Sequence, residues 1–282
     1  MCHGTDGHAL QLLLLLDRVA DGLSRRFVVT SSCIAVQIHD KPLEHVFTED
    51  DWNTWSTVEN GDAYGYAKTQ AEKLVWACVN NPEGCLFDAV SINPGIVLGE
   101  VLCKMHTKSS AVLLRQAIYN NPVLNYPASF VDVKDVARMH VRSLQIAAAG
   151  GRRFIATCDH EPMNTVELSK IAQRLLPQYK LQSEPMYPPF KWALAKTVHY
   201  ATLGKLVLNE FQIRTMEHPI KFSNAAAKSV LNMNFRILGD TIVDTVSSMI
   251  DKKFISPILR PTDGQEADSG FLAGVLDVCV RK

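Results

Sequence analysis

Short apolar runs alternate with helical patterns along roughly the first half of the chain. Residues 27–30, 87–93 and 153–157 are strand-length segments rich in Val, Ile, Phe and Ala, and residues 64–80 have the pattern of a helix. Strands of this kind, separated by helices, are typical of a parallel sheet that is covered on both faces. The pattern therefore predicts an α/β protein, with Ala67, Ala71 and Leu74 of the helix facing the sheet.

After residue 157 the pattern changes to helices separated by Pro-rich loops. Asn164, with Glu167 three residues later, indicates a capping box at the start of a helix over 165–176. Further helices are predicted over 190–208 and over 240–253, the last one beginning at Asp240. This half of the chain should form a smaller, mostly helical unit.

Composition adds few constraints. The 282 residues are 47% hydrophobic, and 29 basic residues balance 29 acidic ones, so charge gives no reason to expect a nucleic acid or a membrane surface as partner. The apolar run at 10–16 is shorter than the ~20 residues that cross a bilayer, and we interpret residues 1–22 as a packing helix. The seven scattered cysteines form no Cys-x-x-Cys pair, which indicates reduced thiols in the cytoplasm and argues against structural zinc. No metal site is predicted.

The candidate chemistry lies in a serine, a tyrosine and a lysine. Ser32 follows the strand at 27–30, and Tyr64 and Lys68 lie one helical turn apart on the next helix. A phenol with a pKa near 10 in water needs help to act as an acid at neutral pH, and an ammonium on the same helix face favours its charged form. The three residues can therefore form a proton relay for carbonyl reduction, with Ser32 holding the substrate oxygen.

Four segments carry a family resemblance. They are residues 26–33 (RFVVTSSC), 64–73 (YGYAKTQAEK), 92–99 (INPGIVLG) and 130–137 (FVDVKDVA). In this order and spacing, they resemble the landmarks of the extended short-chain dehydrogenase/reductases of the epimerase/dehydratase superfamily, and most of all the dihydroflavonol reductase and cinnamoyl-CoA reductase-like branch. Tyr64 and not Tyr66 matches the motif, because only Tyr64 has a lysine four residues later.

The resemblance implies a role for each matching residue. Ser32, Tyr64 and Lys68 would be catalytic, and the cofactor would be NADP or NAD. Tyr64, Lys68, Pro94 and Val97 would contact that cofactor, and Ser32 and Gln37 would contact a small carbonyl substrate. Gln37 stands where plant flavonoid reductases carry Asn or Asp, so a general aldehyde or ketone is expected rather than a flavonoid.

The resemblance also implies a partial Rossmann-type sheet. The family opens with a strand, a Gly-x-x-Gly-x-x-Gly turn and a helix, and this motif does not occur in the sequence. We expect residues 1–160 to be the C-terminal half of an NAD(P)-binding domain, 161–260 a substrate-binding helical region and 261–282 a tail. Two explanations stay open, an incomplete sequence or a protein that is shortened in nature.

Three functions are compatible with these residues. The first is an NAD(P)-dependent carbonyl reductase. The second is a sugar-nucleotide epimerase or hydroxysteroid dehydrogenase with the same three residues, and the third is a non-catalytic scaffold that has kept the fold. A homodimer is expected if the strand at 27–30 forms an uncovered sheet edge. Asp132 and Asp135 suggest paired carboxylates, but we expect Asp135 to cap a helix over 136–147 and Asp132 to fix a loop.

Overall fold

The computed structural model describes residues 26–38, 41–42, 44–81, 87–123, 125–161, 163–202, 213, 216 and 220–260. The helix predicted within residues 1–22 and the tail predicted over 261–282 lie outside these residues.

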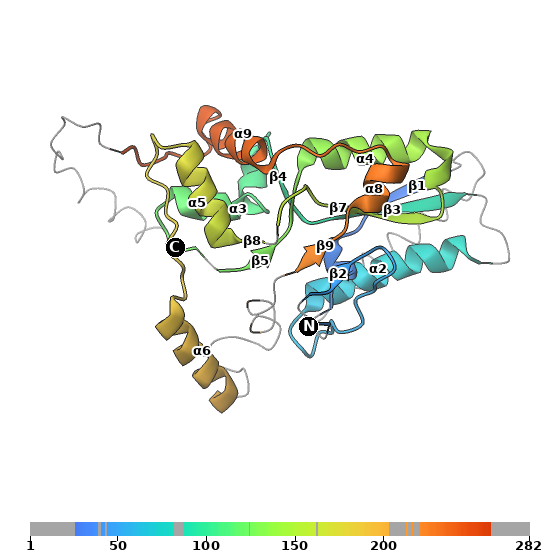
Figure 1. The fold of residues 1–282 in the computed structure, drawn as a ribbon, viewed down its shortest axis with the longest axis horizontal. Coiled ribbons are helices and arrows are strands. Elements are labelled where there is room, and N and C mark those ends of the chain that lie inside the picture. Colours follow the sequence, from blue (N-terminus) through green and yellow to red (C-terminus); the bar gives the residue numbers. More distant parts are fainter. Residues whose placement is uncertain are drawn as a thin grey trace.

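A three-stranded parallel sheet lies at the centre of the fold (Figure 1). Its strands are β1 (Arg26–Thr30), β3 (Asp88–Pro94) and β7 (Arg152–Ala156), in the order β1-β3-β7. Almost all of β3 is buried, as expected for a central parallel strand with both faces covered. The α/β class and the three predicted strands are confirmed. Within the described part of the chain β1 pairs with β3 alone, and a homodimer through its other side stays a prediction.

Two helices cover opposite faces of this sheet (Figure 1). Helix α2 (Ala63–Val79) connects β1 to β3, and α4 (Val133–Gln145) precedes β7. The predicted sheet-facing side of α2 was wrong, since Ala67, Ala71 and Leu74 are only half-buried. The buried residues of α2 are Gly65, Thr69, Glu72 and Val75. Polar Thr69 and Glu72 can occupy this face because both are hydrogen-bonded there.

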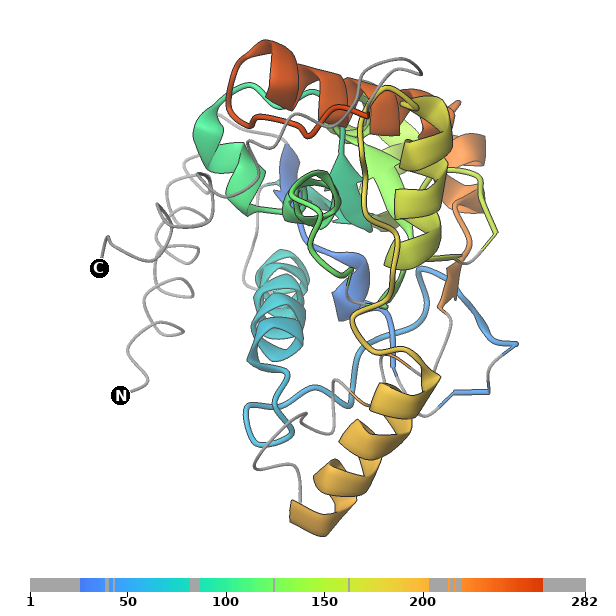
Figure 2. The ribbon, with the colours of Figure 1, turned by 90° about the vertical axis from the view of Figure 1, so that its left-hand side faces the viewer.

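The remaining elements surround this central unit. Three short strand pairs are β2 (Val46–Phe47) with β9 (Lys221–Phe222), β4 (Ile96–Leu98) with β6 (Phe130–Asp132), and β5 (Pro127–Ala128) with β8 (Met163–Asn164). The other helices of the described residues are α3 (Val112–Ile118), α5 (Thr165–Leu175), α6 (Pro189–Thr202), α8 (Ala225–Val230) and α9 (Leu238–Asp251), with 3₁₀ turns η1 (Cys33–Ala35), η2 (Lys104–Lys108) and η3 (Ala147–Ala149). Helix α6 extends away from the rest of the described structure (Figure 2).

Helices α5 and α4 both begin at a residue whose side chain caps the helix, and one of these two capping residues differs from the prediction. The capping box of Asn164 and Glu167 is present at the start of α5, as predicted. The prediction for α4 was wrong, because Asp132 is the capping residue and accepts a hydrogen bond from Lys134 N at 2.7 Å. Asp135 lies in the first turn, fully buried, and accepts from Arg236 N at 2.8 Å. Both carboxylates therefore have structural partners.

One hydrophobic core joins the two halves of the chain. It includes Val90 and Ile92 of β3, Leu168 of α5, and Leu231 and Met249 from the C-terminal segment. Helix α8 packs on β7, and α9 packs on β4 and β6. The C-terminal helices therefore complete the layer over the sheet and help to fix the loops at its carboxyl edge.

In the described residues, no helix has the length and apolar character to cross a membrane. These residues likewise contain no group of three or more His, Cys, Asp or Glu side chains that could hold a metal ion.

Candidate active site

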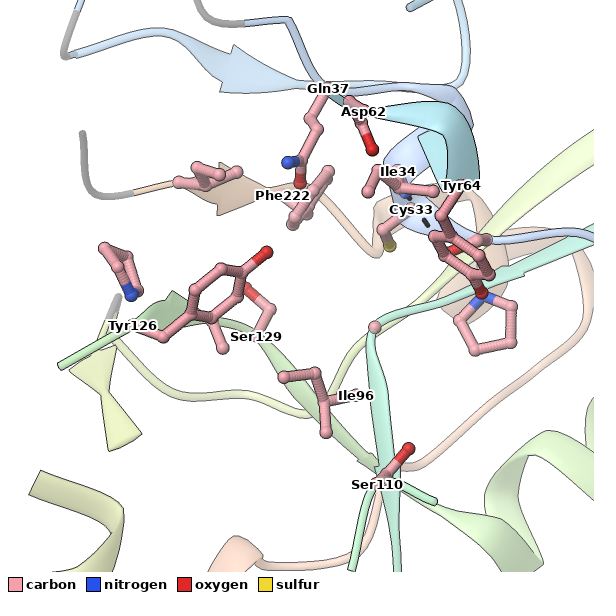
Figure 3. A pocket seen from close by; sticks show the side chains of 16 residues that line it. Cys33, Ile34, Gln37, Asp62, Tyr64, Ile96, Ser110, Tyr126, Ser129 and Phe222 are labelled. Carbon is pink, nitrogen blue, oxygen red and sulfur yellow. Dashed lines mark hydrogen bonds between the residues drawn. The ribbon is translucent and has the colours of Figure 1, made fainter. Parts of the chain in front are cut away.

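A cavity of about 350 Å³ opens at the carboxyl ends of β1 and β3 (Figure 3). Ligands of parallel α/β sheets bind at this edge, because the loops that leave the strands meet there. The lining residues are Ser32, Cys33, Ile34, Gln37, Asp62, Tyr64, Pro94, Gly95, Ile96, Ser110, Tyr126, Pro127, Ala128, Ser129, Ile220 and Phe222. The cavity is large enough for a small organic molecule.

Ser32 lies directly after β1, where the chain turns into η1. Its hydroxyl accepts a hydrogen bond from Ile34 N at 3.2 Å and so caps this short turn. The neighbouring Cys33 thiol is buried and donates to Asn93 O at 3.0 Å. These contacts tie the Ser32 loop to the end of β3 and hold the serine at the cavity.

Tyr64 lies in the first turn of α2 with 59% of its surface exposed. Asp62 caps this helix by accepting from Gly65 N at 2.9 Å, and it also accepts from the Ser56 hydroxyl. A methyl group on Gly65 would lie 2.6 Å from Ser56 Oγ, so the glycine allows the cap to close against the helix. The start of α2, and with it Tyr64, is therefore fixed by buried polar contacts.

Lys68 lies one turn beyond Tyr64, outside the cavity lining. Its Nζ donates to Thr30 O at 3.4 Å, at the end of β1. Burial lowers the pKa of Lys68 below its ordinary value, and the negative charge of Glu72 opposes this shift. The structure thus brings the Lys68 ammonium to the β1 end from which Ser32 also extends.

The remaining predicted residues divide between two cavities. Pro94 and the largely buried Gln37 line the same cavity as Ser32 and Tyr64. Val97 is not part of that lining and instead borders a separate cavity of about 180 Å³ near Gly99.

Sequence reasoning missed the opposite wall of the cavity. This wall includes Tyr126, which directly precedes β5, Ser129 between β5 and β6, and Phe222 in β9. All three residues are far from Tyr64 in the sequence, and none lies in a recognised motif. Burial, together with the charges of Asp62 and Tyr64, raises the pKa of Tyr126 to about 12. The Tyr126 phenol therefore stays protonated around neutral pH and offers a hydrogen-bond donor. The pairing of β9 with β2, which brings Phe222 here, has no signal in the sequence.

The fold and cavity define an α/β protein with a Rossmann-like sheet and a ligand site at its carboxyl edge. No family model matches the chain. NADPH-dependent methylglyoxal reductase GRE2 of Saccharomyces cerevisiae is 29% identical over 241 residues, which are 80% of this chain and 63% of the relative. Cinnamoyl-CoA reductase CAD2 of Medicago truncatula is 29% identical over 235 residues, 82% of this chain and 62% of the relative. The chain thus spans somewhat less than two thirds of the length of these curated relatives.

A solved structure has the same fold. The yeast methylglyoxal/isovaleraldehyde reductase Gre2, crystallised with NADPH, superposes with a TM-score of 0.64 at 23% identity, over 87% of this chain and 69% of that one. These findings confirm the resemblance. The homologues of the chain are methylglyoxal and cinnamoyl-CoA reductases.

Proposed function

We propose that this protein reduces the carbonyl group of a small aldehyde or ketone, with NADPH as the cofactor. The observation that carries the proposal is the placement of Ser32 and Tyr64 in one cavity, with Lys68 one helical turn beyond Tyr64. NADPH is favoured over NADH because the GRE2 relative is NADPH-dependent by name. The cavity volume of about 350 Å³ suits a small carbonyl compound.

The residues present fit the nicotinamide end of such a cofactor. Lys68 supplies an ammonium beside Thr30 O, where it can donate to a ribose hydroxyl. Pro94 and Gly95 form the turn that borders the cavity, where a flat ring can lie against them. NADPH, when bound, supplies the hydride for the carbonyl carbon. Val97 lies in the neighbouring cavity, so we assign it a weaker part in cofactor binding than Pro94.

The side chains of this chain would then handle the carbonyl oxygen. Ser32 donates a hydrogen bond to that oxygen and orients it toward Tyr64. Tyr64 gives its phenolic proton to the oxygen as negative charge develops there. The Lys68 ammonium stabilises the phenolate that remains. Gln37 lies on the same cavity wall and contacts the rest of the substrate.

The test is turnover of NADPH by the 282-residue chain with a panel of small carbonyl compounds. Methylglyoxal and a cinnamoyl thioester lead the panel, because the two relatives are named for these substrates. Ligand-observed NMR with reduced nicotinamide mononucleotide tests the nicotinamide end by itself. We expect NADPH oxidation that depends on the carbonyl compound, and the absence of any such turnover contradicts the proposal.

A further inference from the structure

Beneath the cavity, Glu72 lies at the centre of a buried polar network. It is on α2, one turn beyond Lys68, and only 1% of its surface is exposed. All four of its hydrogen-bonding partners are donors, as an ionised carboxylate requires. They are Ser31 Oγ at 2.5 Å, Arg153 Nε at 2.6 Å, Asn93 Nδ2 at 2.8 Å and Trp76 Nε1 at 3.4 Å.

Three of these donors connect Glu72 to the central sheet, while Trp76 lies on α2 itself. Ser31 follows β1, Asn93 lies in β3 and Arg153 lies in β7. One carboxylate on α2 therefore joins the helix that carries Tyr64 to β3, to β7 and to the residue that follows β1. Asn93 extends this connection, since its Nδ2 also donates to Ser32 O at 3.1 Å.

Arg153 is fixed as firmly as Glu72. Its Nη1 donates to Glu49 O at 2.6 Å and to Asp51 O at 2.7 Å, and its guanidinium lies 3.7 Å from the centre of the Trp52 ring. A buried ion pair that is fully hydrogen-bonded holds its groups in one arrangement, and removal of one partner leaves the other charge without compensation.

We propose that Glu72 is the positioning residue of this site, which holds the Ser31–Ser32 loop and Asn93 on the helix of Tyr64 and supports the charge of Lys68. The inference rests on the proposed function and adds to it the residue that sets the geometry. Glu72 touches neither the cavity nor the reacting atoms. Its effect on Lys68 is electrostatic, because a carboxylate one turn away favours the ammonium that burial disfavours.

The titratable groups near Lys68 come from three elements. They are Tyr64 and Glu72 on α2, His140 on α4, which bonds Thr30 Oγ1 at 2.7 Å, and Arg153 on β7 behind Glu72. Neutralising Glu72 removes the negative charge that supports the Lys68 ammonium against burial, so the ammonium is disfavoured.

The decisive variant is Glu72→Gln, which keeps the size of the side chain and removes its charge. We expect the NMR titration of the Lys68 side chain to move to lower pH, and kcat to fall about 10–100-fold, the range seen when supporting groups behind metal ligands are removed. Glu49→Gln is the matched control. It neutralises the other carboxylate near Arg153, one that accepts from Ile155 N at 2.9 Å and touches neither Ser31 nor Asn93. This control should leave the Lys68 titration unchanged.

A second variant tests the inference in case Glu72→Gln does not fold. Ser31→Ala removes one donor to Glu72 and keeps the ion pair, so it should fold, shift the amide resonance of Ser32, lower kcat and leave the Lys68 titration in place. The inference is overturned if folded Glu72→Gln titrates Lys68 as the wild type does, or if Ser31→Ala leaves the Ser32 resonance and kcat unchanged. An inactive wild-type chain would refute the proposed function alone, because the two NMR measurements need no turnover.

Discussion

A methyl group on Gly95 would clash with the carbonyl oxygen of Ser129, because the two would lie far inside van der Waals contact. The same backbone contact shapes both sides of the cavity, since Gly95 lies at the end of β3 and Ser129 lies between β5 and β6. Ile96 N donates to Ser129 O at 2.7 Å and closes the turn. The two walls are therefore held together by a contact that only glycine permits.

Gly95→Ala should consequently weaken the fold and disturb the cavity. Overpacking of a tight backbone contact costs about 1–3 kcal/mol, and the Pro94 turn must move away from Ser129 to accept the methyl group. Urea unfolding measures the change in the free energy of unfolding. Gly239→Ala in α9 is the control, because the nearest atom there is Leu175 Cδ1 at 3.4 Å. Equal stability changes in the two variants would contradict the close contact.

Tyr64→Phe should remove the proton donor and keep the shape of the ring. General acids of this kind contribute about 10²–10⁴ in rate, so kcat should fall by that factor while the fold is retained. Steady-state kinetics with the best carbonyl substrate measure it. Tyr66→Phe is the control, since Tyr66 is on the same helix, 37% exposed and outside the cavity lining. A Tyr64→Phe enzyme with wild-type turnover would refute the assigned role, and a loss found only in Tyr66→Phe would transfer it.

Lys68 should contribute to the pH dependence of the free energy of unfolding. Its pKa in the folded protein is lowered by burial below the ordinary value of 10.5, so the unfolded chain binds more protons in the pH range just below that value. Stability contributed by Lys68 therefore rises with pH in this range. Lys68→Met should show a smaller gain than the wild type between about pH 8 and about pH 10 in urea unfolding.

The control for this measurement is Lys170→Met, which changes an exposed lysine on α5. It should keep the wild-type slope. A Lys68→Met slope equal to that of the wild type would show that the lysine is not desolvated in the folded protein.

Alkylation of the thiols tests the burial of the segments around the site. Cys33 and Cys158 are buried, and burial raises the pKa of Cys158 to about 12 and that of Cys33 well above its ordinary value. The reactive thiolate is therefore suppressed in both. Iodoacetamide at about pH 8 should label exposed Cys103 in the folded protein and the two buried thiols only after unfolding, as peptide mass spectrometry would show. Labelling of Cys33 as fast as Cys103 would contradict the placement of the loop after β1.

The sequence by itself determined the features that depend on local pattern. The strands at 27–30 and 87–93 were found because β-branched and apolar residues group at strand length, and the start of α5 was found because Asn164 and Glu167 form a cap within one turn. The spacing of Tyr64 and Lys68 on one helix also follows from helix geometry alone.

Only the tertiary structure decided which polar residues are buried and what they contact. No role for Glu72 was predicted from the sequence, and it is buried with Arg153, 81 residues later, donating to it from β7. Asp132 and Asp135 exchanged their expected roles, since Asp132 accepts from Lys134 N at the start of α4 whereas Asp135 accepts from Arg236 N. Tyr126 completes the cavity wall opposite Tyr64 from a segment without a motif. Contacts between residues distant in the chain cannot be recognised from the local pattern of apolar and polar residues, because their energy depends on strands and helices that meet only after folding.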